Sequence, residues 1–289
     1  MKYKAYYRPD TLSDAERLLA ELNGLVLLLA GGTDVMVYAR EDDRYAEHSV
    51  VDIYHLPELR GITEEGDTIR IGAGTTHTEI ETSALIQSHA NVLAMACRTV
   101  GSRQIRDHAT IAGNICNASP AADSLGALAV LGAVLEVRRN GETVLIPLSE
   151  VIEKPYRTAL SDRDLVLAVR IRKLPADEVT HFWKLGRRKA LAISRMTIAT
   201  ILHRDENGVV DDFNITVGAT FPRPMTFPDV NALLLGKKPD AASVKAVAKA
   251  LSDKIPEIAG IRKSTTFKQP VCRNMTERIL SELLLEDEQ

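Results

Sequence analysis

An apolar run that ends in two adjacent glycines constrains the fold of this chain most strongly. The run LVLLLA, residues 25–30, is followed by Gly31 and Gly32 and then by a threonine and an aspartate. The run predicts a buried strand, whereas glycine inside an element costs about 0.5–1 kcal/mol relative to alanine. The chain must therefore turn sharply at the glycines, or another group must approach the backbone closely there.

A second unusual stretch, GSRQIRDHATIAGNICNASPAADS, covers residues 101–124 and is rich in small polar residues. Successive backbone N–H groups in such segments can point at one oxyanion. Two loops of this kind could hold the two ends of one long phosphate-containing ligand. The alternative is that each is an ordinary turn after a strand. A third stretch, IGAGTTHTEI, has His77 where a dinucleotide fingerprint needs its third glycine, so we interpret it as structural.

Composition narrows the class of protein. The chain has 289 residues, 45% hydrophobic and 26% charged, as in soluble globular proteins of one large or two ordinary domains. A net charge of −3 with dispersed basic residues indicates no nucleic-acid or membrane partner. Cys97, Cys116 and Cys272 are far apart, which predicts neither a disulfide framework nor a metal or iron–sulfur site. With no apolar signal segment at the start, we expect a cytoplasmic chain.

Mixed helices and strands are predicted up to about Leu174, which indicates an α+β domain. The expected elements are a helix from Thr11 or Ser13 to Leu22, strands over 25–30, 50–53 and 68–74, a Thr76–Glu79 capping box, a helix over 83–99, and a hairpin over 135–148 that turns at Asn140–Gly141.

The pattern changes after Pro175. Segments 192–205 and 209–220 read as two antiparallel strands joined at 206–208, and helices are predicted over 228–235, 241–255 and 274–285. We therefore expect a domain boundary near residues 175–180.

Three stretches together resemble a known family: LLAGGTDV, QIRDHATIAGNICNASPAADS and FWKLGRRKALAISRM. They are similar to the FAD-binding medium subunits of the molybdenum hydroxylases, and the similarity covers essentially the whole chain. Within this family, the ICNASPAADS stretch looks most like the FAD-binding subunits of bacterial xanthine dehydrogenases.

The resemblance implies an α+β fold in two domains. Residues 1–175 would form an FAD-binding domain of two subdomains, of the vanillyl-alcohol oxidase or PCMH type. Residues 176–289 would form an α+β domain with antiparallel sheet and helices, like the C-terminal domain of carbon monoxide dehydrogenase flavoproteins.

The implied function is electron transfer within an oxidoreductase complex. FAD, bound noncovalently because no histidine sits in a flavin-linking motif, would accept electrons from the 2Fe-2S clusters of a small subunit and pass them to NAD or another acceptor. A large subunit would hold molybdopterin. The alternatives are a self-sufficient FAD-dependent oxidoreductase of the same fold, which would need acid–base residues that we do not find, and a non-catalytic nucleotide-binding or scaffold protein.

The resemblance also assigns cofactor-binding residues, and it assigns no catalytic or metal-ligating ones. The glycine loops would wrap the FAD pyrophosphate, Asp123 and Lys184 would lie near the flavin, and Val166 would contact it. Asp123 could instead cap a helix, and Val166 could be a core residue. Lys184 could be a solvated surface group, with Arg187 or Arg188 taking its place at the cofactor. The full set is Leu29, Ala30, Gly31, Gly32, Thr33, Asp34, Val35, Met36, Gly101, Thr110, Ala112, Gly113, Asn114, Asp123, Val166 and Lys184.

Two positions depart from the family pattern. Ala112 stands where a glycine is usual, which puts a methyl group near the expected phosphate. Val100 stands where animal relatives have an aromatic residue facing the flavin.

Overall fold

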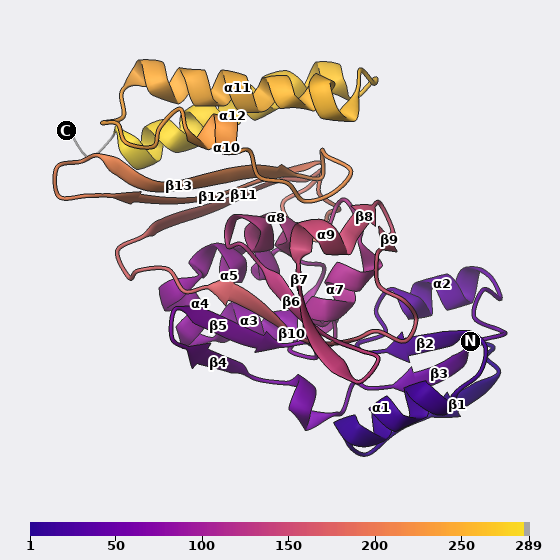
Figure 1. Cartoon of the computed structure of the whole chain (residues 1–289). Coiled ribbons are helices and arrows are strands. Elements are labelled where there is room, and N and C mark those ends of the chain that lie inside the picture. The colour runs from indigo at the N-terminus through magenta and orange to yellow at the C-terminus, as the bar shows by residue number, and fades with distance from the viewer. Residues whose placement is uncertain (286–289) are drawn as a thin grey trace.

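The computed structural model describes residues 1–285, which form three hydrophobic cores one after another along the chain (Figure 1). The first core lies before Pro175, the second lies mainly before it but also includes Phe182, Ala199 and Ile201, and the third lies after it. The mixed α+β character expected from the sequence is confirmed.

The first subdomain is a three-stranded parallel sheet in the order β1-β3-β2. Its core joins apolar residues of the first helix, such as Ala15 and Leu19, to Val26 and Val51 on the strands. The elements are β1 (Ala5–Tyr7), α1 (Leu12–Glu21), β2 (Val26–Leu29), α2 (Val35–Glu41), β3 (Ser49–Asp52) and the short 3-10 helix η1 (Pro57–Leu59).

The second subdomain is a five-stranded antiparallel sheet in the order β4-β5-β10-β6-β7, packed against a group of helices. Its central strand also joins the two subdomains, because Leu165 and Leu167 pack into the first core and Val166 into the second. The strands are β4 (Ile62–Glu65), β5 (Thr68–Gly72), β6 (Val134–Arg139), β7 (Glu142–Pro147) and β10 (Leu165–Arg172), with a small pair β8 (Ile152–Lys154) and β9 (Arg157–Thr158). The helices are α3 (His77–Thr82), α4 (Ala84–His89), α5 (Asn91–Arg98), α6 (Arg103–Arg106), α7 (Ile111–Asn117), α8 (Asp123–Val130) and α9 (Leu148–Val151).

The last unit is an antiparallel sheet, β11 (Val179–Leu185), β12 (Met196–Arg204) and β13 (Val210–Gly218), followed by three helices. These are α10 (Pro228–Asn231), α11 (Ala241–Ala259) and α12 (Thr265–Leu284). The two long helices cover one face of this sheet, and α5 and α8 of the second subdomain pack on the other face (Figure 1). The sheet is therefore the layer that joins the domains.

Predictions from local signals are confirmed. Thr76 and Glu79 form the expected capping box, and Asn140 and Gly141, with φ of 52° and 83°, turn the expected hairpin between β6 and β7.

Several predicted elements differ in extent from the structure, and one strand was not predicted. The expected helix over 83–99 is two helices, because Ala90 leaves the helical conformation (φ −160°, ψ 39°). A third strand, β11, accompanies the predicted pair. Helix α10 ends at Asn231 rather than at 235, whereas α12 begins at Thr265, upstream of the predicted 274, and includes Pro270. Within residues 1–285, no helix is long and apolar enough to cross a membrane.

Candidate cofactor-binding site

Gly31 lies against the second glycine-containing stretch. A Cβ atom at this position would lie 1.9 Å from the backbone oxygen of His108 and 3.2 Å from Cα of Ala109. No side chain fits there, so the close approach anticipated from the sequence is made by another segment of the same chain. The glycine lets α2 and α7 begin next to each other.

Gly32 and its neighbours present a row of unpaired amides. Gly32 has φ of 71°, a conformation that favours glycine. Its carbonyl accepts from Met36 N–H, and Asp34 N-caps α2 without a side-chain hydrogen bond. Within residues 1–285, the backbone N–H groups of positions 31–34 have no hydrogen-bond acceptor. Consecutive free N–H groups in a turn that opens a helix form a concave site for an anion such as phosphate.

The second stretch differs from the expected open loop, because residues 111–117 form helix α7. Thr110 caps this helix: its Oγ1 accepts from Gly113 N–H at 3.2 Å. Ile111 and Ala112 donate their N–H groups to the carbonyls of Thr75 and Ala73. These amides are thus already paired, and the methyl group of Ala112 blocks no free donor. This stretch contributes side chains and surface, whereas the first stretch contributes free amides.

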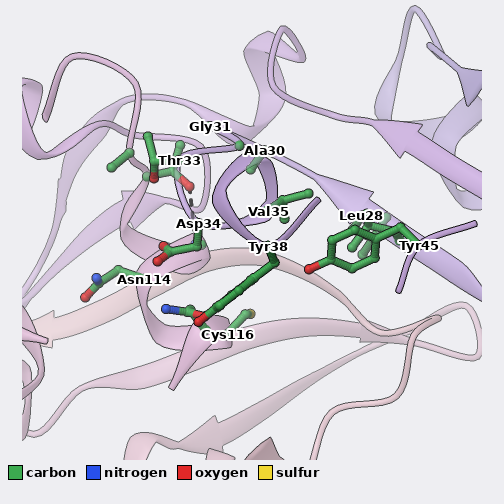
Figure 2. A pocket seen from close by; sticks show the side chains of 16 residues that line it. Leu28, Ala30, Gly31, Thr33, Asp34, Val35, Tyr38, Tyr45, Asn114 and Cys116 are labelled. Carbon is green, nitrogen blue, oxygen red and sulfur yellow. Dashed lines mark hydrogen bonds between the residues drawn. The ribbon is translucent and has the colours of Figure 1, made fainter. Parts of the chain in front are cut away.

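Both stretches line one pocket of about 250 Å³ (Figure 2). Tyr38 of α2 reaches across it toward the α7 side, and Tyr45 lies on its other side (Figure 2). Sequence reasoning missed both tyrosines, although aromatic rings just after a glycine turn were a readable signal. The predicted residues on its wall are Ala30, Gly31, Gly32, Thr33, Asp34, Val35, Thr110, Gly113 and Asn114.

Two polar side chains in this pocket, Asn114 and Asp34, differ in the hydrogen bonds that they can form with a ligand. Asn114 accepts a hydrogen bond at Oδ1 from the Ser124 hydroxyl at 2.7 Å, which leaves its amide nitrogen to donate. Asp34 remains accessible in the pocket, but partial desolvation raises the pKa of its carboxyl group. The pocket therefore offers donors for an anion and an acceptor for a hydroxyl group.

A smaller apolar cavity of about 90 Å³ adjoins this pocket. The two share Leu28, Ala30, Gly113 and Cys116 on their walls. Ala112 and Val166 line the smaller cavity, and both are buried. Leu29 and Met36, by contrast, line neither cavity.

Two of the three remaining predicted residues lie at a separate cleft of about 920 Å³, between the end of α5 and the loop after β11. Gly101 and Lys184 line it. Basic side chains dominate its wall, an arrangement that sequence reasoning missed because the segments are distant in the chain. They are Arg98, Arg103, Arg106, Lys184, Arg187, Arg188 and Lys189.

Lys184 is tied to Asp123. Its Nζ atom donates to Asp123 Oδ2 at 2.6 Å and to the Thr99 carbonyl at 2.9 Å, and the hydroxyl of Ser194 donates to Asp123 Oδ1. Burial raises the pKa of Asp123, and the ammonium group of Lys184 opposes this shift. Ala122, rather than Asp123, is the N-cap of α8. The pair thus links α8 of the second subdomain to the C-terminal sheet.

Comparison with known proteins identifies the family. Residues 1–174 match the model of the FAD-binding domain in molybdopterin dehydrogenase, and residues 181–283 match that of the carbon monoxide dehydrogenase flavoprotein C-terminal domain. The chain belongs to this family of molybdopterin dehydrogenase FAD-binding proteins, an oxidoreductase family, which confirms the resemblance seen in the sequence.

Individual relatives are similar over nearly their whole length. The chain is 31% identical to a xanthine dehydrogenase FAD-binding subunit of Escherichia coli O157:H7, covering 97% of this chain and 96% of the relative. It is 30% identical to the nicotinate dehydrogenase FAD-subunit of Eubacterium barkeri over 98% and 97%. A carbon monoxide dehydrogenase structure from Hydrogenophaga pseudoflava superposes with a TM-score of 0.87 at 25% identity, covering 96% of each chain.

Proposed function

We propose that this chain is the electron-transfer subunit of a xanthine dehydrogenase-like molybdenum hydroxylase and holds FAD noncovalently. The observation that carries the proposal is the row of free amides at positions 31–34, which faces a pocket shared with the second stretch. We also propose the division into an FAD-binding domain, residues 1–175, and a C-terminal domain, residues 176–289.

The residues present fit a flavin dinucleotide. The free amides of positions 31–34 would hold the pyrophosphate, Asp34 would accept from a ribose hydroxyl, and the amide group of Asn114 would donate. Tyr38 and Tyr45 would pack against the adenine base. Bound there, FAD supplies the redox chemistry of the subunit.

The larger cleft would receive the flavin end. Lys184 would place a cation there, balanced by Asp123, and Gly101 would let the chain approach closely. A cation near the flavin favours any negative charge that reduction adds. Since Val100 cannot stack on the ring, this cleft would hold the flavin mainly by charge and shape, and Trp183 is the aromatic side chain on its wall.

The proposed electron path involves two partner subunits. Electrons would arrive from the 2Fe-2S clusters of a small subunit, reduced in turn by a molybdopterin-binding large subunit, and leave to NAD. Family membership and the relatives named as dehydrogenase subunits support this arrangement. We propose a cytoplasmic complex with neither nucleic-acid nor membrane partners.

The amide row can be tested by replacing Gly32 with valine. A β-branched residue is strongly disfavoured at φ of 71°, so Gly32→Val should distort the row and remove FAD from the purified protein. Gly66→Val is the matched control: Gly66 has φ of 62°, lies in the turn between β4 and β5, and has no atom within 4 Å of its Cβ position.

Flavin content is measured by visible absorbance, with folding checked by circular dichroism. Loss of FAD in Gly32→Val but not in Gly66→Val supports the assignment. Normal FAD in a folded Gly32→Val protein would refute it. Acid precipitation should release all flavin into the supernatant, and flavin left on the polypeptide would contradict noncovalent binding.

A second experiment separates the proposal from a self-sufficient oxidoreductase. Under anaerobic conditions, NADH should reduce the flavin of this chain alone, whereas a purine or other heteroaromatic should reduce it only when the partner subunits are present. Flavin reduction by a heteroaromatic with this chain alone would establish the rival function. Absence of NADH reduction would move the acceptor away from NAD.

A further inference from the structure

The turn between β8 and β9 holds a tyrosine in a backbone conformation that tyrosine rarely adopts. Tyr156 has φ of 59° and follows Pro155 directly. A bulky side chain is strained in this left-handed region, where glycine and asparagine are favoured. Tyr156 is 61% exposed and, within residues 1–285, its hydroxyl group forms no hydrogen bond. Neither packing nor hydrogen bonding therefore accounts for a tyrosine at this turn.

The turn is tied to the wall of the pocket that the two glycine-containing stretches share. The N–H of Tyr156 donates to the carbonyl of Ala118 at 2.8 Å. Ala118 ends α7, and Cys116 and Asn117, directly before it, line the pocket. Strand β9 also packs against α7 (Figure 1). Tyr156 is therefore held at the α7 side of the pocket.

The phenol group of Tyr156 also interacts with a tyrosine of the pocket. Tyr38 extends from α2 toward the α7 side (Figure 2). Burial raises the pKa of Tyr38, and the charges of Asp34 and Tyr156 raise it further. Because an electrostatic interaction falls off with distance, the phenol group of Tyr156 must lie close to the hydroxyl end of Tyr38. The two side chains thus come to the pocket from opposite sides.

The surroundings of Tyr156 favour a small ligand over a protein partner. Its neighbours in the hairpin are charged and exposed: Glu153, Lys154 and Arg157, of which Glu153 and Arg157 form an ion pair at 2.9 Å. The core of a protein interface gathers apolar side chains and is depleted of charged ones. A single aromatic ring beside a pocket is instead typical of a residue that packs on the flat face of a bound base.

We propose that Tyr156 is a further cofactor-contact residue, whose ring covers the adenine base from the α7 side. This inference rests on the proposed function, which places the adenine against Tyr38 and Tyr45. Rotation of the exposed side chain breaks neither packing nor a hydrogen bond, so the ring can turn onto the base when FAD binds. Backbone strain that a protein retains is often stored at a binding site. Here the strained turn holds the ring beside the pocket.

Replacing Tyr156 with glycine separates a binding role from a structural one. Tyr156→Gly removes both the ring and the strain, so the cofactor-free chain should unfold at a higher urea concentration. Its dissociation constant for FAD should rise about tenfold, because a stacked aromatic ring is lost. Tyr156→Phe keeps the ring and should bind FAD within about twofold of the wild type. Asn140→Gly is the matched control: Asn140 is also left-handed, with φ of 52°, but it lies at the turn between β6 and β7, lines neither cavity and should leave FAD binding unchanged.

FAD is removed from the purified full-length chain, which is then titrated with FAD and, in competition, with ADP. ADP carries the adenine base and both phosphates but no flavin, so Tyr156→Gly should weaken its binding by the same factor as that of FAD. Unchanged FAD affinity in Tyr156→Gly would overturn the proposal. Weaker FAD binding with a lower urea midpoint would also overturn it, since the turn would then be purely structural, and so would a loss for FAD alone, which would place Tyr156 at the flavin end. A wild-type chain that binds no FAD would instead refute the proposed function, which separates the two failures.

Discussion

Replacement of Lys184 by methionine tests the buried ion pair that links the domains. In the wild-type protein, Lys184 donates to both Asp123 and the Thr99 carbonyl, and the side chains of the pair are only 14% and 6% exposed. Methionine has a similar length and no charge, so Lys184→Met leaves the Asp123 carboxylate buried without its cationic partner, with only neutral hydroxyl groups, those of Ser194 and Thr99, beside it. Breaking a buried pair in this way costs about 3–5 kcal/mol.

The pH dependence of the free energy of unfolding gives a more precise expectation for Lys184→Met. Without Lys184, the pKa of Asp123 rises further above its usual value, because burial is no longer opposed by the ammonium group. The Asp123 carboxyl group of the variant can then avoid the cost of a buried, unpaired negative charge by taking up a proton. With an unfolded-state pKa of about 3.9, that uptake costs at most about 4 kcal/mol at pH 7 and about 1.5 kcal/mol at pH 5. A raised carboxyl pKa contributes stability at low pH that is lost as the pH rises, so the variant should be least stable at neutral pH.

The assay is urea unfolding at pH 5 and pH 7, followed by the fluorescence of Trp183, the sole tryptophan, which lies next to Lys184 on β11. The double variant Asp123→Asn/Lys184→Met is the control, because it removes the carboxyl group and should lose most of the pH dependence. A cost below about 1 kcal/mol for Lys184→Met, equal at both pH values, would mean that the pair is solvated and would refute the reasoning.

Two further predictions concern packing and protonation. Gly31→Ala should destabilise the protein by about 3 kcal/mol and release FAD, because its methyl group would overlap the His108 carbonyl. Gly126→Ala is the control: this glycine lies within α8, where an added Cβ would make ordinary contacts, so the substitution should stabilise the helix by about 1 kcal/mol. Equal changes in the free energy of unfolding for Gly31→Ala and Gly126→Ala, measured by urea unfolding, would contradict the overlap at Gly31. Burial and the nearby Asp212 raise the pKa of Glu178 to about 7. Its contribution to stability should thus be lost as the pH rises from about 4.5 through 7, by about 3 kcal/mol, and Glu178→Gln should abolish that loss in urea unfolding at several pH values.

Features with local causes could be predicted from the sequence. The Asn140–Gly141 turn and the Thr76–Glu79 capping box depend on residues that are neighbours in the chain, and both are confirmed. Features that depend on contacts between residues far apart in the chain could not be predicted. The break at Ala90 has no glycine or proline to mark it, and β11 is a strand because it pairs with β12 along its whole length.

The same division applies to the candidate site. The glycines marked the two stretches that share a pocket, but not the reason for each glycine. Gly31 is required by the carbonyl of His108, a contact that only the folded chain reveals. Nor could the sequence distinguish the free amides of positions 31–34 from those of Ile111 and Ala112, which donate to the neighbouring segment.

Under the proposed function, two separate parts of the chain would bind FAD and position its flavin end. The free amides at positions 31–34 belong to the first subdomain, whereas Lys184 belongs to the C-terminal sheet and meets Asp123 of α8 across the domain junction. Under the proposed placement, the amides determine whether FAD binds, and the junction determines how its flavin end is presented to an electron donor. Lys184→Met should therefore keep FAD at pH 5, where its cost in stability is small, and still slow flavin reduction by the partner subunits. Reduction at the wild-type rate would place the flavin away from this junction.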